Sequence, residues 1–346
     1  PSGDNCQPWR FHLAGGELSI THDAARARHL LDHNDFCSIL ALGCVLEALD
    51  IAASVEGLRC APRLSLDAPR GGPWARVRFA RSDAPPHPLA EAIFARCADR
   101  RLHRRGSIAH PVFAAIRRDG QRFDDAALHV IAEPDRALMR YLLDSDRYIW
   151  RHPRIVDDIL PWIRFTREEI LATRDGIGWA SLGFDLPEIP GLGLTRWRPL
   201  PRIIDRLHLF SVARRWFHLT LRSAAALLCV TVSTPRKASL VSAGRLAYLA
   251  WVRLNQAGFG VQPMTIQAMP IYHVEVGGLP EGTLPEFHEH YRRGRAVVAR
   301  GFGYPEAELP VWMFRTGQSS PLPAALKSLR LRTEDILTID TVDGAG

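Results

Sequence analysis

The first part of the chain alternates short stretches of strand periodicity with one long apolar stretch at helical spacing. Cys37–Val55 is apolar at helical spacing and ends at Gly57, a suitable helix C-cap. Alternating or apolar runs bounded by turn residues predict strands. The predicted strands are Trp9–Leu13, Glu17–Thr21, Leu64–Leu66 and Ala75–Ala80, the first two joined by a Gly15-Gly16 turn.

The remainder of the chain repeats this order. Three prolines at 85, 86 and 88 interrupt the pattern, and a new helix is predicted to start at Leu89–Cys97. Further helices are predicted at Leu138–Ile149 and Gly244–Gln256. Further predicted strands are Leu227–Val232, Ile266–Met269 and Ile271–Val276. Helices and strands mixed in this way indicate an α+β protein.

A loose internal repeat divides the chain in two. The segments GCVLEALDIAASVEGL, from Gly43, and GRLAYLAWVRLNQAGFG, from Gly244, look like equivalent helix-then-glycine elements. We therefore predict a first half at residues 1–88 and a second half at 89–346. A Gly/Pro-rich stretch at about 176–201 reads as a lid-like insertion, since long irregular loops are uncommon in compact domains.

Composition indicates an ordinary folded protein with a mild positive charge. The 346 residues are 47% hydrophobic and 23% charged, which excludes wholesale disorder. The net charge is +7, and only Lys237 and Lys327 among the 44 basic residues are lysines. No run of five basic residues occurs, so nucleic-acid binding is not indicated. Local arginine clusters suit a single phosphate group better.

Neither long apolar stretch predicts a membrane span. Ala224–Val232 is too short, and the stretch from Phe36 to Val55 carries Glu47 and Asp50. No signal peptide is visible. The six cysteines lack zinc-site spacing and are interpreted as free thiols in a reducing cytoplasm. We therefore expect a cytoplasmic protein with no membrane partner.

The polar residues of the N-terminal segment PSGDNCQPWRF are the first candidates for binding. Its turn-rich start, with Ser2, Gly3, Asn5 and Gln7, offers side-chain and backbone groups that can hold the polar edge of a ring. The competing interpretation is a polar loop before an edge strand.

Two cationic segments are the next candidates. ADRRLHRRG at 98–106 contains Arg100, Arg101 and Arg104, and a helix would place Arg100 and Arg104 on one face. Guanidinium groups at this spacing suit a phosphate, although a solvated basic face is an equal alternative. LKSLRLRTEDIL at 326–337 adds Lys327 and Arg330, which could close around the same dianion.

The segment GFGVQPMT at 258–265 follows the predicted long helix. Gln262, Pro263 and Met264 could present backbone to a flat ligand, and a helix cap followed by a turn at Pro263 is the alternative. HEH at 288–290 is interpreted as part of a solvated helix, because no third ligand lies at metal-site spacing. No P-loop and no G-x-S-x-G segment is present.

Taken together, these segments resemble the FMN-dependent nitroreductase family. PSGDNCQPWRF resembles its P-S-x-x-N-x-Q-P-W-x-F signature, RRLHR its phosphate-binding R-x-S-x-R segment, and GFGVQPM its flavin-facing segment. KSLR followed by TEDIL resembles its C-terminal basic contact, and GFGYPE its preceding turn. Leu102 stands where the family usually has Ser or Thr. The resemblance spans nearly the whole chain.

The order of the segments is reversed relative to most of the family, in which two subunits build each flavin site. The resemblance therefore implies a nitroreductase-like fold whose two halves form an intramolecular pseudo-dimer around a mixed antiparallel sheet and hold one FMN. This order resembles the Acg-type branch and the nitroreductase-like domains fused to a ThiF-type adenylyltransferase domain. The start of the chain at Pro1, inside the motif, fits the fused branch.

The resemblance also implies roles for individual residues. Ser2, Asn5 and Gln7 would lie along the isoalloxazine ring, with Gly3 beside them. The family pattern places Pro263 and Met264 near the reactive edge, next to Gln262. The expected contacts to the phosphate or the pyrimidine edge are Arg100, Arg101, Arg104, Lys327 and Arg330. No catalytic side chain and no metal are implied.

The implied activity is two-electron transfer from NADH or NADPH through FMN to an electron-poor small molecule. The first alternative is an FMN-sequestering protein in which the 176–201 stretch covers the flavin and little reductase activity remains. The second is a flavin module that serves an attached ThiF-like domain. The substrate and the preferred nicotinamide are left open.

Overall fold

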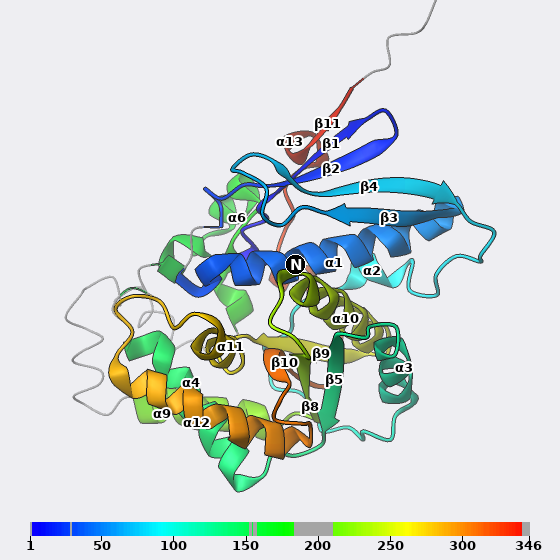
Figure 1. Cartoon of the computed structure of the whole chain (residues 1–346). Coiled ribbons are helices and arrows are strands. Elements are labelled where there is room, and N and C mark those ends of the chain that lie inside the picture. The colour runs from blue at the N-terminus through cyan, green and yellow to red at the C-terminus, as the bar shows by residue number, and fades with distance from the viewer. Residues whose placement is uncertain (1, 28–29, 152–153, 155–157, 183–209, 341–346) are drawn as a thin grey trace, which may run out of the picture.

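The computed structural model describes residues 2–27, 30–151, 154, 158–182 and 210–340. Two β-sheets and the helices between and around them make up this part of the chain (Figure 1). The mixture of helices and predominantly antiparallel sheets confirms the α+β class expected from the sequence.

The first sheet is built mainly from the N-terminal part of the chain. Its strands, in spatial order, are β11 (Leu337–Ile339), β1 (Trp9–Ala14), β2 (Glu17–His22), β4 (Pro73–Arg81) and β3 (Leu58–Leu64). All neighbours are antiparallel except β11, which pairs parallel with β1 in the register Phe11 to Leu337. The C-terminal end of the described chain therefore returns to the first strand.

The second sheet comes from later residues and is entirely antiparallel. Its order is β5 (Ala126–Ile131), β8 (Ala226–Val232), β10 (Leu309–Gln318) and β9 (Phe259–Met264). Every residue of β8 is buried, as expected for a strand covered on both faces. A short parallel pair joins β6 (Ile163–Arg164) to β7 (Ile177–Gly178).

The helices fall into two groups (Figure 1). α1 (Phe36–Ala53) and α10 (Lys237–Gln256) lie side by side between the sheets, α1 contacting β3 and α10 contacting the second sheet. A separate apolar cluster packs a second group on the other side of that sheet. The remaining helices are α2 (Ala92–Ala95), α3 (Pro111–Gly120), α4 (Arg136–Arg151), α6 (Arg167–Thr173), α9 (Phe210–Arg222), α11 (Met269–Val276), α12 (Pro285–Phe302) and α13 (Thr333–Ile336).

Several predicted elements differ from the structure. The predicted strands Ile266–Met269 and Ile271–Val276 are wrong, because α11 occupies Met269–Val276 with Pro270 in its first turn, where proline is tolerated. A short apolar run does not distinguish a strand from a buried helix. The predicted helix at Leu89–Cys97 is reduced to α2. The predicted strand at Leu64–Leu66 is misplaced, because the observed strand β3 begins at Leu58 and ends at Leu64, so the two share only Leu64.

α1 and α10 touch through backbone at a pair of glycines. A Cβ atom on Gly43 would lie 2.2 Å from the carbonyl oxygen of Val241, and one on Gly244 would lie 2.0 Å from the carbonyl oxygen of Leu40. Such distances are far inside van der Waals contact, so the helices can approach this closely only with glycine at both positions. These two glycines begin the two segments that looked equivalent in the sequence.

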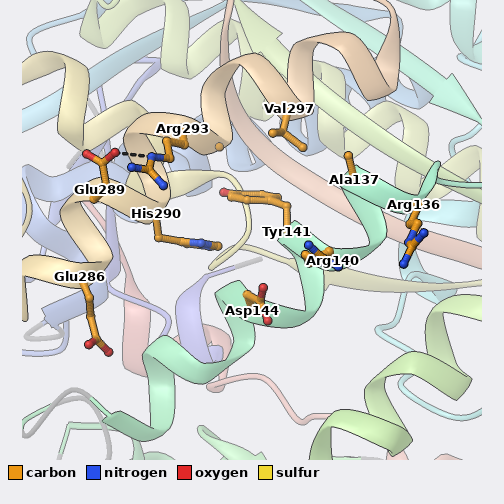
Figure 2. A pocket seen from close by; sticks show the side chains of 11 residues that line it. Arg136, Ala137, Arg140, Tyr141, Asp144, Glu286, Glu289, His290, Arg293 and Val297 are labelled. Atoms are coloured by element: carbon orange, nitrogen blue, oxygen red, sulfur yellow. Dashed lines mark ion pairs between the residues drawn. The ribbon is translucent and has the colours of Figure 1, made fainter.

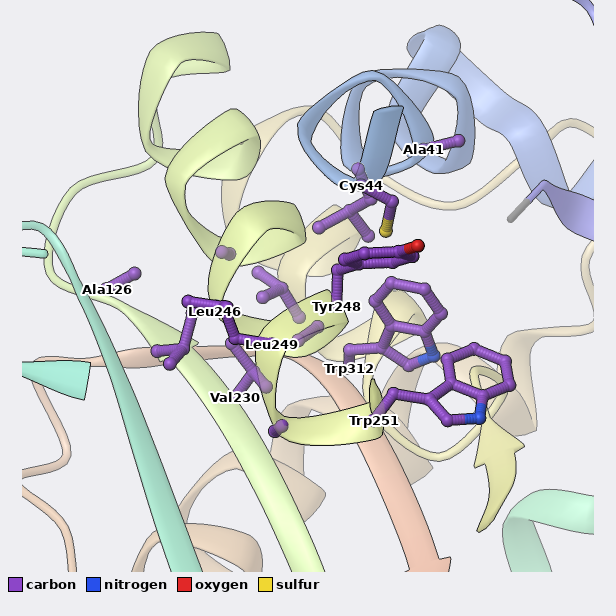
Figure 3. Packing of buried hydrophobic residues seen from close by; sticks show 14 of the residues in the cluster. Ala41, Cys44, Ala126, Val230, Leu246, Tyr248, Leu249, Trp251 and Trp312 are labelled. Atoms are coloured by element: carbon purple, nitrogen blue, oxygen red, sulfur yellow. The ribbon is translucent and has the colours of Figure 1, made fainter. Parts of the chain in front are cut away.

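Polar and apolar contacts extend this crossing. Tyr248 and Trp251 of α10 pack with Trp312 of β10 beneath Ala41 and Cys44 of α1 (Figure 3). At the other side of the crossing, the Nε atom of Arg245 lies 2.7 Å from Oε2 of Glu47, a carboxylate with 1% exposure. Burial raises the pKa of Glu47, while Arg245 and Arg122 lower it. A charge buried to this extent needs such partners.

The apolar character of α1 follows from this buried position. By length and composition alone, the segment Asp32–Glu56 could cross a membrane. Its most apolar 18 residues have a mean hydropathy of 2.0, and 67% of them are buried inside the protein. A helix in contact with another helix through backbone and with a sheet through side chains is explained as a core helix.

The start of α1 is fixed by a buried carboxylate. Asp32 Oδ1 accepts the backbone N–H of Ser38 at 2.9 Å, and Oδ2 accepts the Ser38 hydroxyl at 2.5 Å. His22 Nε2 lies 3.0 Å from the same hydroxyl oxygen. Burial raises the pKa of Asp32 to about 7, with hydrogen bonds from Ser38 acting in the opposite direction.

Replacing Gly244 by alanine should destabilise the fold by about 3 kcal/mol or more, because the added methyl group would overlap backbone that cannot move independently. Chemical denaturation of the purified variant, or loss of soluble protein, would report this. Gly120→Ala is the matched control, since its Cβ would meet only Leu246 at 3.8 Å. Wild-type stability of Gly244→Ala would contradict the close crossing.

Asp32 should make stability depend on pH. Its folded pKa is raised, so the folded state retains a proton that the unfolded state loses, and stability should fall as pH rises from about 4 to about 7. Asp32→Asn should remove that loss and be more stable than wild type at pH 8 by about 2–4 kcal/mol, with little difference at pH 4. Urea unfolding at both pH values measures it. The exposed Asp67→Asn serves as control, and equal behaviour of the two variants would contradict the assignment.

Candidate functional site

The N-terminal segment is held in an unusual backbone conformation. Gly3–Asn5 forms a single 3-10 turn, and Asp4, Asn5 and Gln7 all have positive φ angles, of 44°, 56° and 51°. The backbone N–H of Gln7 donates to Ser2 Oγ at 2.9 Å and closes the turn. Non-glycine residues at positive φ are strained, and such strain persists where surrounding contacts fix it.

Asn5 links this segment to two distant parts of the chain. Its Nδ2 donates to the carbonyl oxygens of Gly176 and Leu329, each at 3.0 Å. Its Oδ1 accepts a hydrogen bond from Arg330. Asn5 is 7% exposed, so these contacts satisfy a buried amide.

The side chain of Gln7, two residues further along, also forms hydrogen bonds with backbone groups of two distant segments. Its Nε2 donates to the carbonyl oxygen of Arg174 at 3.0 Å, and its Oε1 accepts the backbone N–H of Leu331 at 2.9 Å. The amides of Gln7 and Asn5 are therefore engaged within the protein. Contact with a flavin ring, as expected from the resemblance, would require them to exchange partners.

The arginine segment is extended, so the predicted helical pairing of Arg100 and Arg104 is wrong. Arg104 is exposed and forms a β-bridge with Gln318, at the end of β10 and beyond the residues of that strand that pair with β8. Arg100 is half-buried, and its Nη1 donates to the carbonyl oxygen of Ser181 at 3.2 Å. Burial lowers the pKa of Arg100, whereas nearby Asp4 and Asp99 raise it. Arg100 thus faces the N-terminal segment.

Arg101 is committed to a different contact. Its guanidinium pairs with Asp99 at 2.8 Å and donates to Ser319 Oγ at 3.0 Å and to the carbonyl oxygen of Ser320 at 2.7 Å. Burial alone would raise the pKa of Asp99, yet hydrogen bonds from Arg101 and Ser319 hold it at about 2. Because Arg101 is neutralised by a carboxylate, it is a weaker candidate for binding an anion.

Lys327 and Arg330 form a cationic group with a residue that the sequence reasoning missed. Burial lowers the pKa of Arg330, and the charge of Arg96 lowers it further. Burial raises the pKa of Tyr248, and the charges of Arg96 and Arg330 oppose that rise. Burial likewise raises the pKa of Cys97, and the charges of Lys327 and Arg96 oppose it. The Arg96 guanidinium lies 4.5 Å from the centre of the Trp251 ring. Within the described residues, neither Arg96 nor Lys327 has a carboxylate within 4.0 Å. Three cations from two segments therefore lie near one another, and we call Arg96, Lys327 and Arg330 the cationic cluster.

The residues Gln262, Pro263 and Met264 lie in β9 and not in a turn. They pair with Arg315, Phe314 and Met313 of β10. Pro263 is compatible with this position because β9 is an edge strand of its sheet. The Met264 side chain is buried, and Gln262 Oε1 accepts a hydrogen bond from Arg315. Arg315 is a second residue that sequence reasoning missed, although an arginine inside the apolar run LPVWMFRTGQ was a visible signal.

A cavity of about 620 Å³ lies elsewhere, between α4 and α12 (Figure 2). Glu289 is paired with Arg293 and Asp144 with Arg214. Of the HEH residues, His288 is exposed, whereas His290 is half-buried, lies 2.8 Å from Ser145 Oγ and stacks on Tyr141, so this segment is only partly solvated. None of the predicted binding residues lines this cavity.

A group with metal-ligand chemistry lies at the start of α1. His22, Asp32 and Asp35 each place one ligand-type atom within 4.8 Å of the others. Asp32 and His22 are already bonded to Ser38, as described above. These hydrogen bonds at the start of α1 account for the positions of Asp32 and His22, and we assign no metal to the group.

Most of the predicted lid, about 176–201, lies outside the described residues. The part that is described, Gly176 to Leu182, lies against the N-terminal segment. It contributes the carbonyl oxygens that Asn5 and Arg100 contact, and Ser181 Oγ donates to the carbonyl oxygen of Leu326 at 2.8 Å. The beginning of the 176–201 stretch therefore joins the N-terminal, arginine and C-terminal segments.

No family model and no curated protein matches the chain. Among solved structures, it is similar to a nitroreductase with bound FMN from Desulfitobacterium hafniense (11% identity, TM-score 0.40, covering 73% of this chain and 98% of that one). It is also similar to the FMN- and NADPH-dependent nitroreductase NfnB from Sphigopyxis sp. (12% identity, TM-score 0.41, 74% and 100%). A third is NfnB from Mycobacterium smegmatis in complex with NADPH (11% identity, TM-score 0.40, 73% and 98%).

Proposed function

We propose that this chain is an FMN-binding oxidoreductase of the nitroreductase type that transfers two electrons from NADH or NADPH to an electron-poor small molecule. One observation carries the proposal. The three segments that resemble the family's flavin contacts, around residues 5, 100 and 330, are far apart in the sequence and are joined by direct hydrogen bonds or shared partners. The proposed localisation is cytoplasmic.

The cationic cluster fits the phosphate of FMN. Burial lowers the pKa of Arg330 and the charge of Arg96 lowers it further, so this pair of cations is electrostatically unfavourable unless an anion offsets it. Guanidinium groups offer paired donors to phosphate oxygens, and a lysine adds a point charge. Arg96, Lys327 and Arg330 would hold the phosphate, with Arg100 facing the same segment. Arg101 and Arg104 are weaker candidates for holding the phosphate, because Arg101 is paired with Asp99 and Arg104 is exposed and bridges to Gln318.

The glycine crossing supports an intramolecular pseudo-dimer. The two helices that meet at Gly43 and Gly244 belong to the segments that looked equivalent, one in residues 1–88 and one in 89–346. Each half contributes most of one sheet, and β11 is the exception because it crosses from the second half to the first sheet. The proposed relationship is to the Acg-type or ThiF-fused branch. A ThiF-like reading frame in phase upstream of Pro1 would distinguish the fused form.

The chemistry proposed here needs little from the side chains. When bound, FMN accepts a hydride from a nicotinamide and passes electrons to the substrate. The residues of this chain bind and orient the cofactor, and Asn5 and Gln7 hold the segments that carry the cations. No acid or base side chain is assigned to the reaction.

A second candidate function is FMN sequestration. It is favoured by the contacts of the 176–182 segment, whose Gly176 and Ser181 carbonyl oxygens already accept hydrogen bonds from Asn5 and Arg100. A segment tied down in this way covers the groups expected to face the flavin. Electron transfer would then be restricted by access to the cofactor.

The two lysines of the chain provide a matched test of phosphate binding. Lys327→Ala should weaken FMN binding by about five- to tenfold but change riboflavin binding by less than about twofold, since riboflavin lacks the phosphate. Lys237→Ala, which removes an exposed pair with Asp67 and a hydrogen bond to the carbonyl oxygen of Leu66, should change neither. Flavin fluorescence titration measures both ligands. Equal loss of FMN and riboflavin binding in Lys327→Ala would contradict the phosphate assignment.

Anaerobic mixing of the FMN-loaded protein with NADH or NADPH separates the two candidate functions. An oxidoreductase should lose the oxidised flavin absorbance within seconds to minutes and recover it when a nitroaromatic acceptor is added. Absorbance that persists would support sequestration, because the covering segment would exclude the nicotinamide. Failure of the wild-type protein to bind FMN at all would overturn both.

A further inference from the structure

Arg315 is a charged residue at the centre of the second sheet. It lies in β10 with 0% exposure, between Phe314 and Thr316, which are also buried. Burial lowers the pKa of Arg315 to about 10, so it stays charged at neutral pH. Burying a guanidinium is costly unless its donors are satisfied, so each of its contacts is informative.

The donors of Arg315 are used mainly on the arginine segment. Its Nη2 donates to the carbonyl oxygens of Arg100 and Arg101, both at 2.8 Å. Its Nη1 donates to the carbonyl oxygen of Thr220 at 3.3 Å. One guanidinium therefore fixes two consecutive peptide groups of an otherwise extended segment that has no helix to hold it.

The same side chain also bonds to β9, the strand that carries the predicted flavin contacts Gln262, Pro263 and Met264. Its Nε donates to Gln262 Oε1 in β9. Its Nη1 also lies 3.3 Å from His103 Nδ1. Burial and the charge of Arg315 lower the pKa of His103 to about 4, so the imidazole is neutral and its Nδ1 accepts this hydrogen bond. Arg315 thus ties residues 100–103 to β9.

These contacts do not amount to an ordinary buried ion pair. The neighbouring carboxylate, Asp99, is bonded to Arg101 and Ser319. Arg315 instead directs its donors at the carbonyl oxygens of Arg100 and Arg101, of which the first is bonded to the carbon next to the Arg100 Cα, and the Arg100 side chain extends from that fixed peptide group to Ser181. Backbone fixed at these two carbonyls limits where the Arg100 guanidinium can lie.

We infer that Arg315 is a positioning residue that holds residues 100–103 against β9, so that Arg100 faces the FMN site. The inference rests on the proposed function. Arg315 acts through Arg100, and its removal should therefore matter for FMN binding only while the Arg100 side chain is present.

A double-mutant cycle tests this coupling on the full chain. Arg315→Lys keeps the charge but loses the planar set of donors, and it should weaken FMN binding by about tenfold. In the Arg100→Ala background, the same substitution should change FMN affinity by less than about twofold. Arg315→Met is the stronger variant, with Arg315→Lys retained in case the methionine variant does not fold. FMN titration by fluorescence is the measurement.

Arg253→Met is the control for loss of a partly buried arginine, because it removes an ion pair between α10 and α3 away from the site. It should lower the unfolding midpoint without changing FMN affinity. Equal effects of Arg315→Lys with and without Arg100 would show a general structural role and overturn the inference. Wild-type affinity in Arg315→Lys would do the same. A wild-type protein that does not bind FMN would instead overturn the proposed function, and the inference with it.

Discussion

The contact between α1 and α10 at Gly43 and Gly244 is the constraint on which the arrangement of this protein depends. Two helices that touch through backbone have no layer of side chains that could be repacked, so their separation is fixed. Each helix carries one sheet on its outer side. The distance between the sheets, and hence between the segments that leave their edges, follows from that single crossing.

A network of amide and guanidinium groups then joins the segments that meet at one end of the crossing. Asn5, Gln7 and Arg174 have positive φ angles, a conformation that costs each residue about 1 kcal/mol or more. The hydrogen bonds that Asn5 donates to the carbonyl oxygens of Gly176 and Leu329, and the one that Gln7 accepts from the N–H of Leu331, offset this cost. The polar residues are thus part of the fold as well as candidates for binding, and their two roles share the same atoms.

The sequence predicted the individual segments of the fold and of the candidate site better than it predicted the contacts between those segments. The alternation in β2 matches the alternating burial of its residues, and the long apolar stretch of α1 matches a helix that is buried on most of its surface. The strands predicted over α11 are wrong because a short apolar run has no distinguishing period. Lys327 and Arg330 were recognised from local charge, whereas Arg96 and Arg315 join the same region only through tertiary contacts. No local pattern indicates which distant carbonyl a buried arginine will bond.

The parallel pairing of β11 with β1 has a consequence for how the molecule is made. Residues 326–331 are held at one end by Ser181 and at the other by β11, so they form a strap that closes only when both ends are anchored. Domains start to fold from the N-terminus while synthesis continues. On the ribosome, the first strand must therefore keep one edge unpaired until Leu337–Ile339 has emerged, and Lys327 and Arg330 reach their places only when that strand pairs.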